Sequence, residues 1–355
     1  MLLPIIFAIN FLVAIASFFT FYSVEISPEK FWMAGFVSWL TPSLLLINGL
    51  FIVFWLLVKP FRSVLSGVVL VLGFKFVQST FSFSISKDLD KDSFKVLSYN
   101  VKVFNIYANS NSSNFESTEK MLSWIKAQDA DIMCFQEFYN EKKSTKFNTV
   151  SQLSQSGKYK WYFEPFFTNA VNGKFGMSIF SKYPIINKGM IDLGRTNNQA
   201  IYVDIKKSGK IIRIYNFHLH SMSLDEDELV KTIKGEGSEF EKLNVINRIK
   251  NGFIQKARQV RQVDDHIKDS PYPVVACGDL NDTPYSYCYE VLTDRLRNSF
   301  EAAGNGFGFT FNGKVPFLRI DHQFASKEIK AQKFTTFDKV KYSDHFPICG
   351  VYTLE

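Results

Sequence analysis

The chain has 355 residues and a formal net charge of +7 at pH 7, and 46% of its residues are hydrophobic. This composition suits a globular chain and not a disordered one. The positive charge favours anionic partners such as nucleic acid, phospholipid headgroups or phosphorylated small molecules. The hydrophobic residues are spread unevenly, because many of the 37 phenylalanines precede residue 85. We therefore expect an N-terminal part that contacts lipid and a remainder that contacts water.

Three apolar segments open the chain. Residues 1–24 and 31–58 contain no charged side chain, and each is long enough to cross a hydrocarbon core as a helix, which needs about 20 residues. A third apolar run begins at Ser63 and is interrupted by Lys75, whose amine can face other helices or reach the interface. The first segment lacks the basic start and the cleavage site of a signal peptide, so we expect it to be retained.

The segments predict a transmembrane anchor of residues 1–86, with two to three helices over about residues 3–24, 33–58 and 63–84. The loop after the second segment carries Lys59 and Arg62, whereas the loop after the first carries two glutamates and one lysine. Basic short loops face the cytoplasm. Three spans would therefore place everything after residue 86 outside the cytoplasm. If the third segment lies in the interface without spanning, the rest of the chain is cytoplasmic.

Residues 87–93 form a charged linker, and residues 94–355 read as a water-soluble domain. Content of β-branched and aromatic residues predicts strands; these cover 95–104, 131–138, 158–167, 175–184, 199–219, 273–282, 319–326 and 347–354. A hairpin turn is expected at Ser208-Gly209. Helical patterns end near residue 130 and extend over 221–268. Strands dominate and helices lie between some of them, which indicates an α/β or α+β layered domain on mixed sheets. The four cysteines match no zinc pattern, and nothing in the sequence requires a disulfide.

Polar clusters stand at the ends of several apolar strands. An apolar run explains a strand, but it does not explain a carboxylate, an amide or an imidazole at its end. The clusters, in chain order, are SYN with Asn100, QE with Glu137, NFHLH with Asn216 and His218, GDLND with Asp279 and Asn281, RID with Asp321, and SDH with Asp344 and His345. Any one of them could be an ordinary turn or cap. Their joint occurrence predicts a functional site.

These residue types suit hydrolysis of a phosphate ester, which requires neutralisation of charge on the phosphoryl and leaving oxygens. Hard cations such as Mg²⁺ provide this and prefer carboxylate oxygens, for which Glu137 and Asp344 are suited. A water nucleophile needs a base, and Asp279 or His345 could serve. An amide such as that of Asn100 can hold a phosphate oxygen without adding negative charge.

Other residues have more than one interpretation. Asp321 could fix the tautomer and orientation of the His345 ring. Arg319 could reach a phosphate oxygen, and a structural ion pair is equally consistent with its position. The basic stretch around Lys256, Arg258 and Arg261 is typical of a solvated helix face. His220 lies two residues after His218, and a role at the rim of the site is favoured for it.

The ordered set SYN, QE, NFHL, GDLND, RIDH and SDHFP resembles the endonuclease/exonuclease/phosphatase superfamily, over about residues 94–355. That superfamily includes pancreatic-type deoxyribonuclease, abasic-site endonucleases, inositol polyphosphate phosphatases and bacterial sphingomyelinases. The resemblance implies a four-layered α/β sandwich of two mixed β-sheets flanked by helices. The three apolar runs ahead of this domain resemble a bacterial branch of the superfamily. Together with the basic residues in the short loops, this resemblance predicts a multi-pass protein of the bacterial inner membrane, and the loop charges predict an extracytoplasmic catalytic domain.

The resemblance also implies roles for the polar clusters and a Mg²⁺ or Mn²⁺ cofactor. Glu137 would bind the metal, Asp344 would be a metal-side carboxylate, and Asn100 and Asn281 would contact metal or phosphate. Asp279 would orient or deprotonate water, and His218 would polarise the scissile phosphate or donate a proton. Asp321 and His345 would form an Asp–His pair. Abasic-site endonucleases carry a different residue at the position of His218. One departure concerns residues 173–184, which offer no acidic partner for His218 and leave its orientation open.

The sequence therefore predicts a membrane-anchored, metal-dependent phosphoesterase that uses activated water on a phosphodiester or phosphomonoester. An extracytoplasmic nuclease is one alternative, and a non-catalytic binding module, disfavoured by the completeness of the residue set, is another. The linker reaches at most about 25 Å, which holds the site near anionic lipid that repels duplex DNA. A phospholipid headgroup or a small phosphodiester is therefore favoured over long duplex DNA as the substrate, and nucleic acid stays among the candidate partners.

Overall fold

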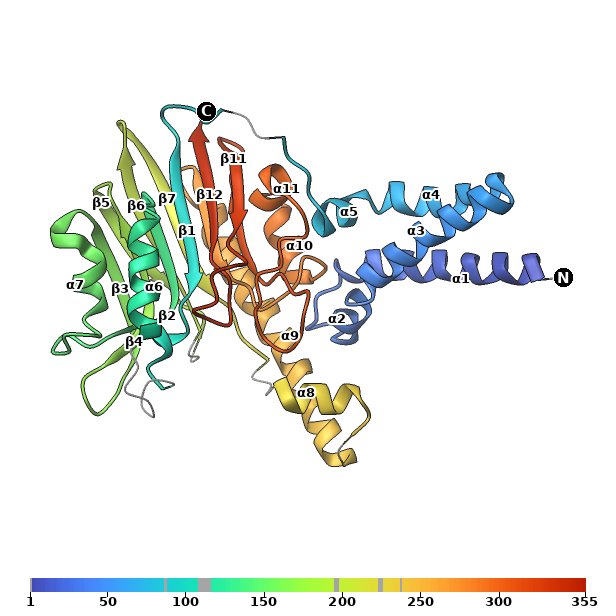
Figure 1. Ribbon diagram of the computed structural model, residues 1–355, viewed down its shortest axis with the longest axis horizontal. Coiled ribbons are helices and arrows are strands. Elements are labelled where there is room, and N and C mark those ends of the chain that lie inside the picture. Colours follow the sequence, from blue (N-terminus) through green and yellow to red (C-terminus); the bar gives the residue numbers. More distant parts are fainter. Residues whose placement is uncertain (1, 86–87, 108–115, 195–197, 223–225, 237) are drawn as a thin grey trace.

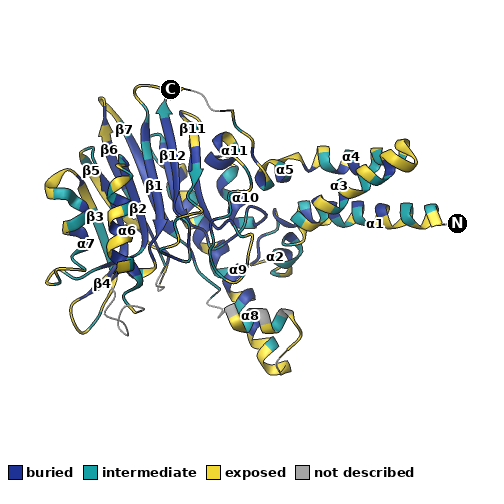
Figure 2. Ribbon diagram, viewed as in Figure 1, coloured by how far each residue is buried: buried dark blue, intermediate teal, exposed yellow. Residues whose placement is uncertain are grey.

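The computed structural model describes residues 2–85, 88–107, 116–194, 198–222, 226–236 and 238–355. An elongated helical part of residues 2–80, which we call the anchor after its predicted role, projects from one side of a larger domain that begins at residue 94 (Figure 1). The domain buries most of its strands, whereas the anchor helices expose much of their apolar surface (Figure 2). Residue 87 of the expected linker, and residues 223–225 and 237 of the expected helical region, lie outside the described residues.

The domain is built on two six-stranded sheets, ordered β11-β12-β1-β2-β4-β3 and β5-β6-β7-β8-β10-β9. The strands are β1 (Phe94–Asn100), β2 (Ile132–Asn140), β3 (Lys160–Thr168), β4 (Lys174–Ser181), β5 (Ile185–Ile191), β6 (Gln199–Lys207), β7 (Lys210–His218), β8 (Val274–Asp279), β9 (Arg297–Asn298), β10 (Asp321–Ala325), β11 (Ile329–Thr336) and β12 (Ile348–Leu354). Each sheet contains one parallel pair, β1 with β2 and β7 with β8, among antiparallel pairs. Both sheets are therefore mixed, as predicted.

Helices cover the outer face of each sheet and complete four layers. Those of the domain are α6 (Glu116–Ala127), α7 (Thr149–Ser154), α8 (Glu226–Ile233), α9 (Glu239–Lys268), α10 (Tyr287–Thr293) and α11 (Ser299–Ala303). One buried cluster joins the first sheet to α6 and α7, a second joins the other sheet to α9 and α10, and a third lies between the sheets. The predicted four-layered sandwich is confirmed.

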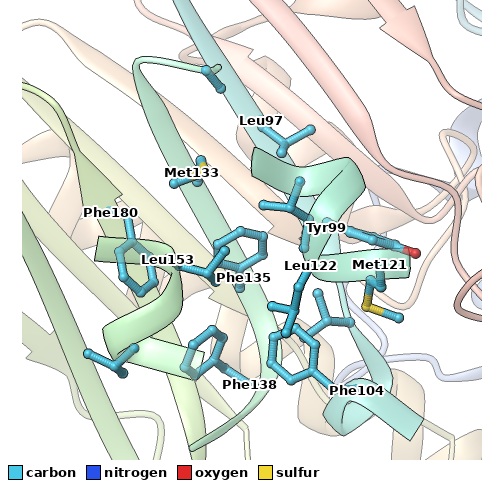
Figure 3. Packing of buried hydrophobic residues seen from close by; sticks show 14 of the residues in the cluster. Leu97, Tyr99, Phe104, Met121, Leu122, Met133, Phe135, Phe138, Leu153 and Phe180 are labelled. Carbon is cyan, nitrogen blue, oxygen red and sulfur yellow. The ribbon is translucent and has the colours of Figure 1, made fainter. Parts of the chain in front are cut away.

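Alternation along β1 explains how one strand serves two layers. Leu97 and Tyr99 pack with Leu122 of α6 on the outer side (Figure 3), whereas Phe94 and Val96 belong to the cluster between the sheets. Successive side chains of a strand point to opposite faces, so a strand buried on both faces reads as a nearly continuous apolar run. β1 is therefore packed on both of its faces, and Asn100 is its last residue.

The predicted strands occur close to their expected positions, with differences at their ends. The strand expected over 95–104 stops at Asn100, because residues 102–105 have φ values of 43° to 56° and form the turn η2 (Lys102–Asn105). The turn at Ser208-Gly209 is confirmed, with φ values of 48° and 82° that suit a type I′ hairpin. β5, β9 and β11 were not predicted. All four cysteines are free and buried.

The anchor contains two helical segments long and apolar enough to cross a membrane, Leu2–Ser23 and Met33–Val58. Its elements are α1 (Leu2–Ser23), α2 (Met33–Ser38), α3 (Thr41–Val58), η1 (Pro60–Arg62), α4 (Ser63–Leu72) and α5 (Phe74–Thr80). The third segment was expected as one helix over 63–84, but it bends by 73° between α4 and α5 and its helix ends at Thr80. The break lies at Gly73, where a Cβ atom would lie 2.4 Å from the Phe21 ring.

The anchor contacts the domain directly and is not joined to it by the linker alone. Glu29, in the loop between α1 and α2, forms ion pairs with Arg258 at 2.6 Å and with Arg261. Both arginine side chains stay about half exposed, at 55% and 43%, so the expected solvated face is kept there although each arginine also pairs with Glu29. The expectation is wrong for Lys256, which is 0% exposed and pairs with Asp282 at 2.9 Å.

Candidate active site

The ends of four strands bring four of the predicted residues to one edge of the sandwich. Asn100 ends β1, His218 ends β7 and Asp279 ends β8, while Asp321 begins the antiparallel strand β10. The strand register pairs Asp279 with His218 on one side and with Asp321 on the other. Since parallel strands end at the same edge and an antiparallel neighbour begins there, the fold itself collects these side chains.

Glu137 reaches this edge through an irregularity in β2. The register between β2 and β4 shifts between Phe135 and Phe138, and Glu137 has a φ of 49°. A bulge of this kind re-aims a side chain at the cost of local strain. The Glu137 side chain is 38% exposed, so the bulge presents its carboxylate to solvent beside the buried Asp279.

The amide of Asn100 joins the two carboxylates. Its Nδ2 donates to Glu137 Oε1 and to Asp279 Oδ2, each at 3.1 Å, and its Oδ1 accepts from the backbone N–H of Lys102. The hydroxyl of Ser343 donates to the Asn100 carbonyl at 2.8 Å. A neutral amide thus holds two negative groups close together without adding charge of its own. In this orientation the amide nitrogen, and not the oxygen, faces the site.

Asp279 lies at the centre of the cluster. It is 1% exposed, and its Oδ1 accepts from the backbone N–H of Asn281 at 2.7 Å. Its Oδ2 lies 3.6 Å from Nε2 of His218 and 3.8 Å from Nε2 of His345. One carboxylate oxygen is therefore fixed by the loop that follows β8, while the other faces both histidines.

The loop after β8 holds Asn281 in place from two directions. The Asn281 side chain donates to the Leu219 carbonyl at 3.0 Å, and its backbone carbonyl accepts from Lys256 at 2.6 Å. Gly278 permits the close approach of β7 and β8, because a Cβ atom there would lie 1.9 Å from the Phe217 carbonyl oxygen. The amide of Asn281 thus shapes the loop, and its predicted contact with phosphate or metal stays a prediction.

His345 and Asp321 form a buried hydrogen-bonded pair. Nδ1 of His345 lies 2.8 Å from Oδ2 of Asp321. Burial lowers the pKa of His345, but the charges of Asp321 and Asp279 outweigh it and raise that pKa to about 10. These acidic neighbours favour the protonated form of the ring. Of the two predicted bases, Asp279 has a carboxylate oxygen that faces both histidines, and this geometry makes it the preferred candidate.

His218 is the predicted residue whose orientation the sequence left open. β4 and the residues that follow it offer no carboxylate to this ring. Its Nε2 instead lies between Asp279 Oδ2 at 3.6 Å and Glu137 Oε1 at 3.9 Å. The acidic neighbours of His218 thus come from β8 and from the bulge in β2.

Asp344, predicted as a metal-side carboxylate, pairs with a lysine and a serine. Its Oδ2 lies 2.7 Å from the ammonium of Lys102, and its Oδ1 accepts from Ser343. Burial raises the pKa of Asp344, but the charges of His345 and Lys102 leave it below the usual value. Lys102 and Ser343 are thus its partners in the structure, and its role as a metal ligand stays a prediction.

Arg319 does not face the cluster. Its guanidinium is buried, donates to the carbonyls of Phe307 (2.9 Å) and Ser79, and lies 3.9 Å from the centre of the Phe300 ring. These contacts engage the guanidinium away from any phosphate bound beside Asp279. The structural interpretation of Arg319 replaces the expected phosphate contact, with carbonyl partners in place of an ion pair.

Several residues of the site were missed in the sequence. Lys102 follows Asn100 by two positions, and only the left-handed turn η2 brings its ammonium to Asp344. Thr310 accepts hydrogen bonds through Oγ1 from the backbone N–H groups of Ile320 and Asp321 at 3.0 Å, and no local pattern marks it. Asp282 had a signal, because it closes the GDLND motif, yet its partner Lys256 lies on α9.

Comparison with known proteins gives two family matches. A model described as the endonuclease/exonuclease/phosphatase family matches residues 97–345, and a domain of unknown function matches residues 3–80. No curated protein matches the chain.

Solved structures share the fold. An endonuclease/exonuclease/phosphatase from Bacteroides vulgatus is 16% identical, with 75% of this chain and 100% of that chain covered, at a TM-score of 0.54. The human Nocturnin catalytic domain with bound sulfate is 18% identical, with 76% and 96% covered, at 0.53. A mannosyl-6-phosphatase from Bacteroides thetaiotaomicron VPI-5482 is 16% identical, with 74% and 100% covered, at 0.54. At these identities the likeness concerns the fold alone.

Proposed function

The chain belongs to the endonuclease/exonuclease/phosphatase family, and from this premise we propose that it is a membrane-anchored, metal-dependent phosphoesterase that hydrolyses a phosphodiester or phosphomonoester with activated water. One observation carries the proposal. A single amide, that of Asn100, binds the carboxylates of both Glu137 and Asp279, beside the buried pair of His345 and Asp321. This arrangement combines negative oxygen donors, a candidate base and a protonated imidazole at one edge of the fold.

The residues present fit a hard divalent cation. Glu137 offers a partly exposed carboxylate next to that of Asp279, and carboxylate oxygen is the donor that Mg²⁺ and Mn²⁺ prefer. The ligand atoms of Asp279, Asp321 and His345 also lie within 4.8 Å of one another. Nδ1 of His345 is already bonded to Asp321, however, so we assign the metal to Glu137. When bound, the ion would neutralise charge on the phosphoryl group and lower the pKa of water.

The side chains of this protein would perform the proton transfers and stabilise the developing charge. Asp279 accepts the proton of the attacking water as the new P–O bond forms and the ester P–O bond breaks. The imidazolium of His345, fixed by Asp321, stabilises negative charge that develops on the phosphoryl oxygens. His218, whose Nε2 faces the same space, polarises the phosphate or donates a proton to the leaving oxygen.

The experiment that tests this function is a substrate panel with the full chain in detergent and in liposomes. We expect turnover of a chromogenic phosphodiester, a small phosphomonoester or a phospholipid headgroup. His218→Ala should lower the rate by about 10²–10⁴-fold, the usual range for an acid–base group. His220→Ala is the matched control, because its Nδ1 contacts Asn198 at 3.2 Å and not the cluster. Salt-sensitive nicking of plasmid DNA with no turnover of lipid or small esters would favour a nuclease instead.

We further infer that the catalytic domain lies on the membrane face opposite to Lys59 and Arg62. The Arg62 guanidinium donates to the Leu3 carbonyl at 3.1 Å, which puts the basic loop beside the chain start. The loop after α1, together with α5, instead lies against the domain (Figure 1). If α1, α3 and the third segment from Pro60 to Leu72 all cross the membrane and basic loops face the cytoplasm, the domain is extracytoplasmic. A reporter that is active only after export, fused after residue 90, should be active; activity of a cytoplasm-only reporter there would reverse the assignment.

A further inference from the structure

The short helix α5, which ends the third apolar segment, is attached to the catalytic domain by a row of polar contacts. Lys75 pairs with Glu290 at 2.5 Å, Ser79 donates to Glu301 at 2.5 Å, and Thr80 Oγ1 lies 2.8 Å from the Tyr285 hydroxyl. Beyond the helix, Ser82 forms a β-bridge with Gly306. The last turn of the anchor and the segment after it are therefore part of the domain surface.

Arg319 makes the most deeply buried of these contacts. Its side chain is 4% exposed, and within the described residues its hydrogen-bond partners are the carbonyls of Ser79 and Phe307, separated from it by 240 and 12 residues. A buried charge is costly unless its donors are satisfied. The Ser79 carbonyl near the end of α5 accepts from one of its nitrogens, whereas Nε of Arg319 has no hydrogen-bond partner among the described residues. Movement of α5 away from the domain would therefore leave a second nitrogen of this buried cation without a partner.

Arg319 stands two residues before Asp321, and the backbone between them is hydrogen-bonded to Thr310, which also bonds the segment of His345. Thr310 accepts through Oγ1 from the N–H groups of Ile320 and Asp321, and its own carbonyl accepts from the N–H of Phe346 at 2.6 Å. Phe346 directly follows His345. The segment from Phe307 to Thr310 thus contacts Arg319 at one end, through the Phe307 carbonyl. At the other end, Thr310 bonds the backbone of Asp321 and the backbone of Phe346, the residue after His345.

We propose that Arg319 is a positioning residue through which α5 holds the Asp321–His345 pair in its working geometry, so that the packing of the third membrane segment governs turnover. This inference rests on the proposed function. It assigns the anchor a regulatory role in addition to attachment. Because a misplacement of about 1 Å can cost roughly 10²-fold in rate, a small shift of α5 is sufficient for the effect.

The break at Gly73 shows how a change in the membrane segment would reach α5. The Phe21 ring of α1 occupies the space where a Gly73 side chain would lie, and it stacks on Phe76 of α5 with ring centres 4.8 Å apart. A larger residue at position 73 must displace Phe21, and with it the partner of Phe76. Gly67, on α4, has no atom within 4 Å of an added Cβ, so the same substitution there should leave α5 in place.

Full-length variants in detergent test the proposal at Arg319 in the domain and at Gly73 in the anchor. Arg319→Met and Gly73→Leu should each lower kcat by about 10- to 100-fold with KM nearly unchanged, and Arg319→Lys should recover part of the loss. Two matched controls should stay within about twofold of the wild type: Glu290→Gln, which removes the charge from another α5 contact, and Gly67→Leu. Wild-type kcat in Arg319→Met, or equal losses in Arg319→Met and Glu290→Gln, would overturn the inference.

Hydrogen exchange separates failure of this inference from failure of the proposed function. The N–H of Asp321, bonded to Thr310, should exchange faster in Gly73→Leu than in wild type or Gly67→Leu, whether or not a substrate is known. This measurement also covers the case in which Arg319→Met does not fold. Unchanged exchange over residues 307–323 in Gly73→Leu would show that the anchor does not reach the pair. Inactivity of the wild type with faster exchange in Gly73→Leu would remove the proposed function and keep the coupling.

Discussion

Removal of divalent metal ions is expected to reduce phosphoester hydrolysis by the full chain to background, and Mg²⁺ or Mn²⁺ is expected to restore it. The reason is the charge in the site, where Glu137 and Asp279 share the amide of Asn100 and leave negative charge facing the phosphate. A phosphate ester approaching these carboxylates is repelled unless a cation neutralises them. Glu137→Gln should lower kcat/KM by about 10²–10³-fold, the scale for loss of one electrostatic group in a catalytic site.

The control for Glu137 lies on the chain segment that follows the same strand. Glu141 accepts a hydrogen bond from the Tyr139 hydroxyl at 3.0 Å and contacts none of the site residues described above. Glu141→Gln should therefore retain the wild-type metal requirement and rate. The measurement is initial rate against free metal concentration after passage over a chelating resin. Full activity in chelator, or equal losses in Glu137→Gln and Glu141→Gln, would contradict metal binding at Glu137.

The part of the site that could be predicted is the part that strand ends place. Asn100, His218, Asp279 and Asp321 each terminate or begin a buried strand, and a strand buried on both faces is visible in the sequence as a nearly continuous apolar run. Their polar side chains were visible because they interrupt apolar runs. The position of Glu137 was harder to derive, because it depends on a bulge and a positive φ, which apolar patterning does not reveal.

Contacts between distant segments account for the errors. An arginine beside the start of a strand gives the same sequence signal whether it binds phosphate or a carbonyl. The partner of Arg319, Ser79, is 240 residues away, in a part of the chain expected to lie in lipid. Lys256 was predicted to be solvated because its neighbours in sequence are basic, yet it is buried and pairs with the buried Asp282. In the anchor, hydropathy identified the apolar segments but not the bend at Gly73, where the ring of the distant residue Phe21 lies against the backbone.

The buried pair of His345 and Asp321 should behave as one unit in mutagenesis. His345→Asn should lower kcat/KM by about 10²–10⁴-fold, and Asp321→Asn should lower it by a similar factor because the ring loses the group that orients it. The double variant should be little worse than either single one, since groups that act together are not additive. Independent, multiplying losses would show that Asp321 acts elsewhere.

A pH series on the metal-free chain gives a second measurement of the same pair. The pKa of His345 is raised from 6.5 to about 10 by Asp321 and Asp279 despite its burial. A raised pKa in the folded state stabilises the fold in full below about pH 6.5, and this contribution is lost as the pH rises through about 10. The melting temperature of the wild type should therefore fall over this interval more steeply than that of His345→Asn. Parallel curves would mean that the ring is neutral in the folded chain, and His345 would then become a candidate base alongside Asp279.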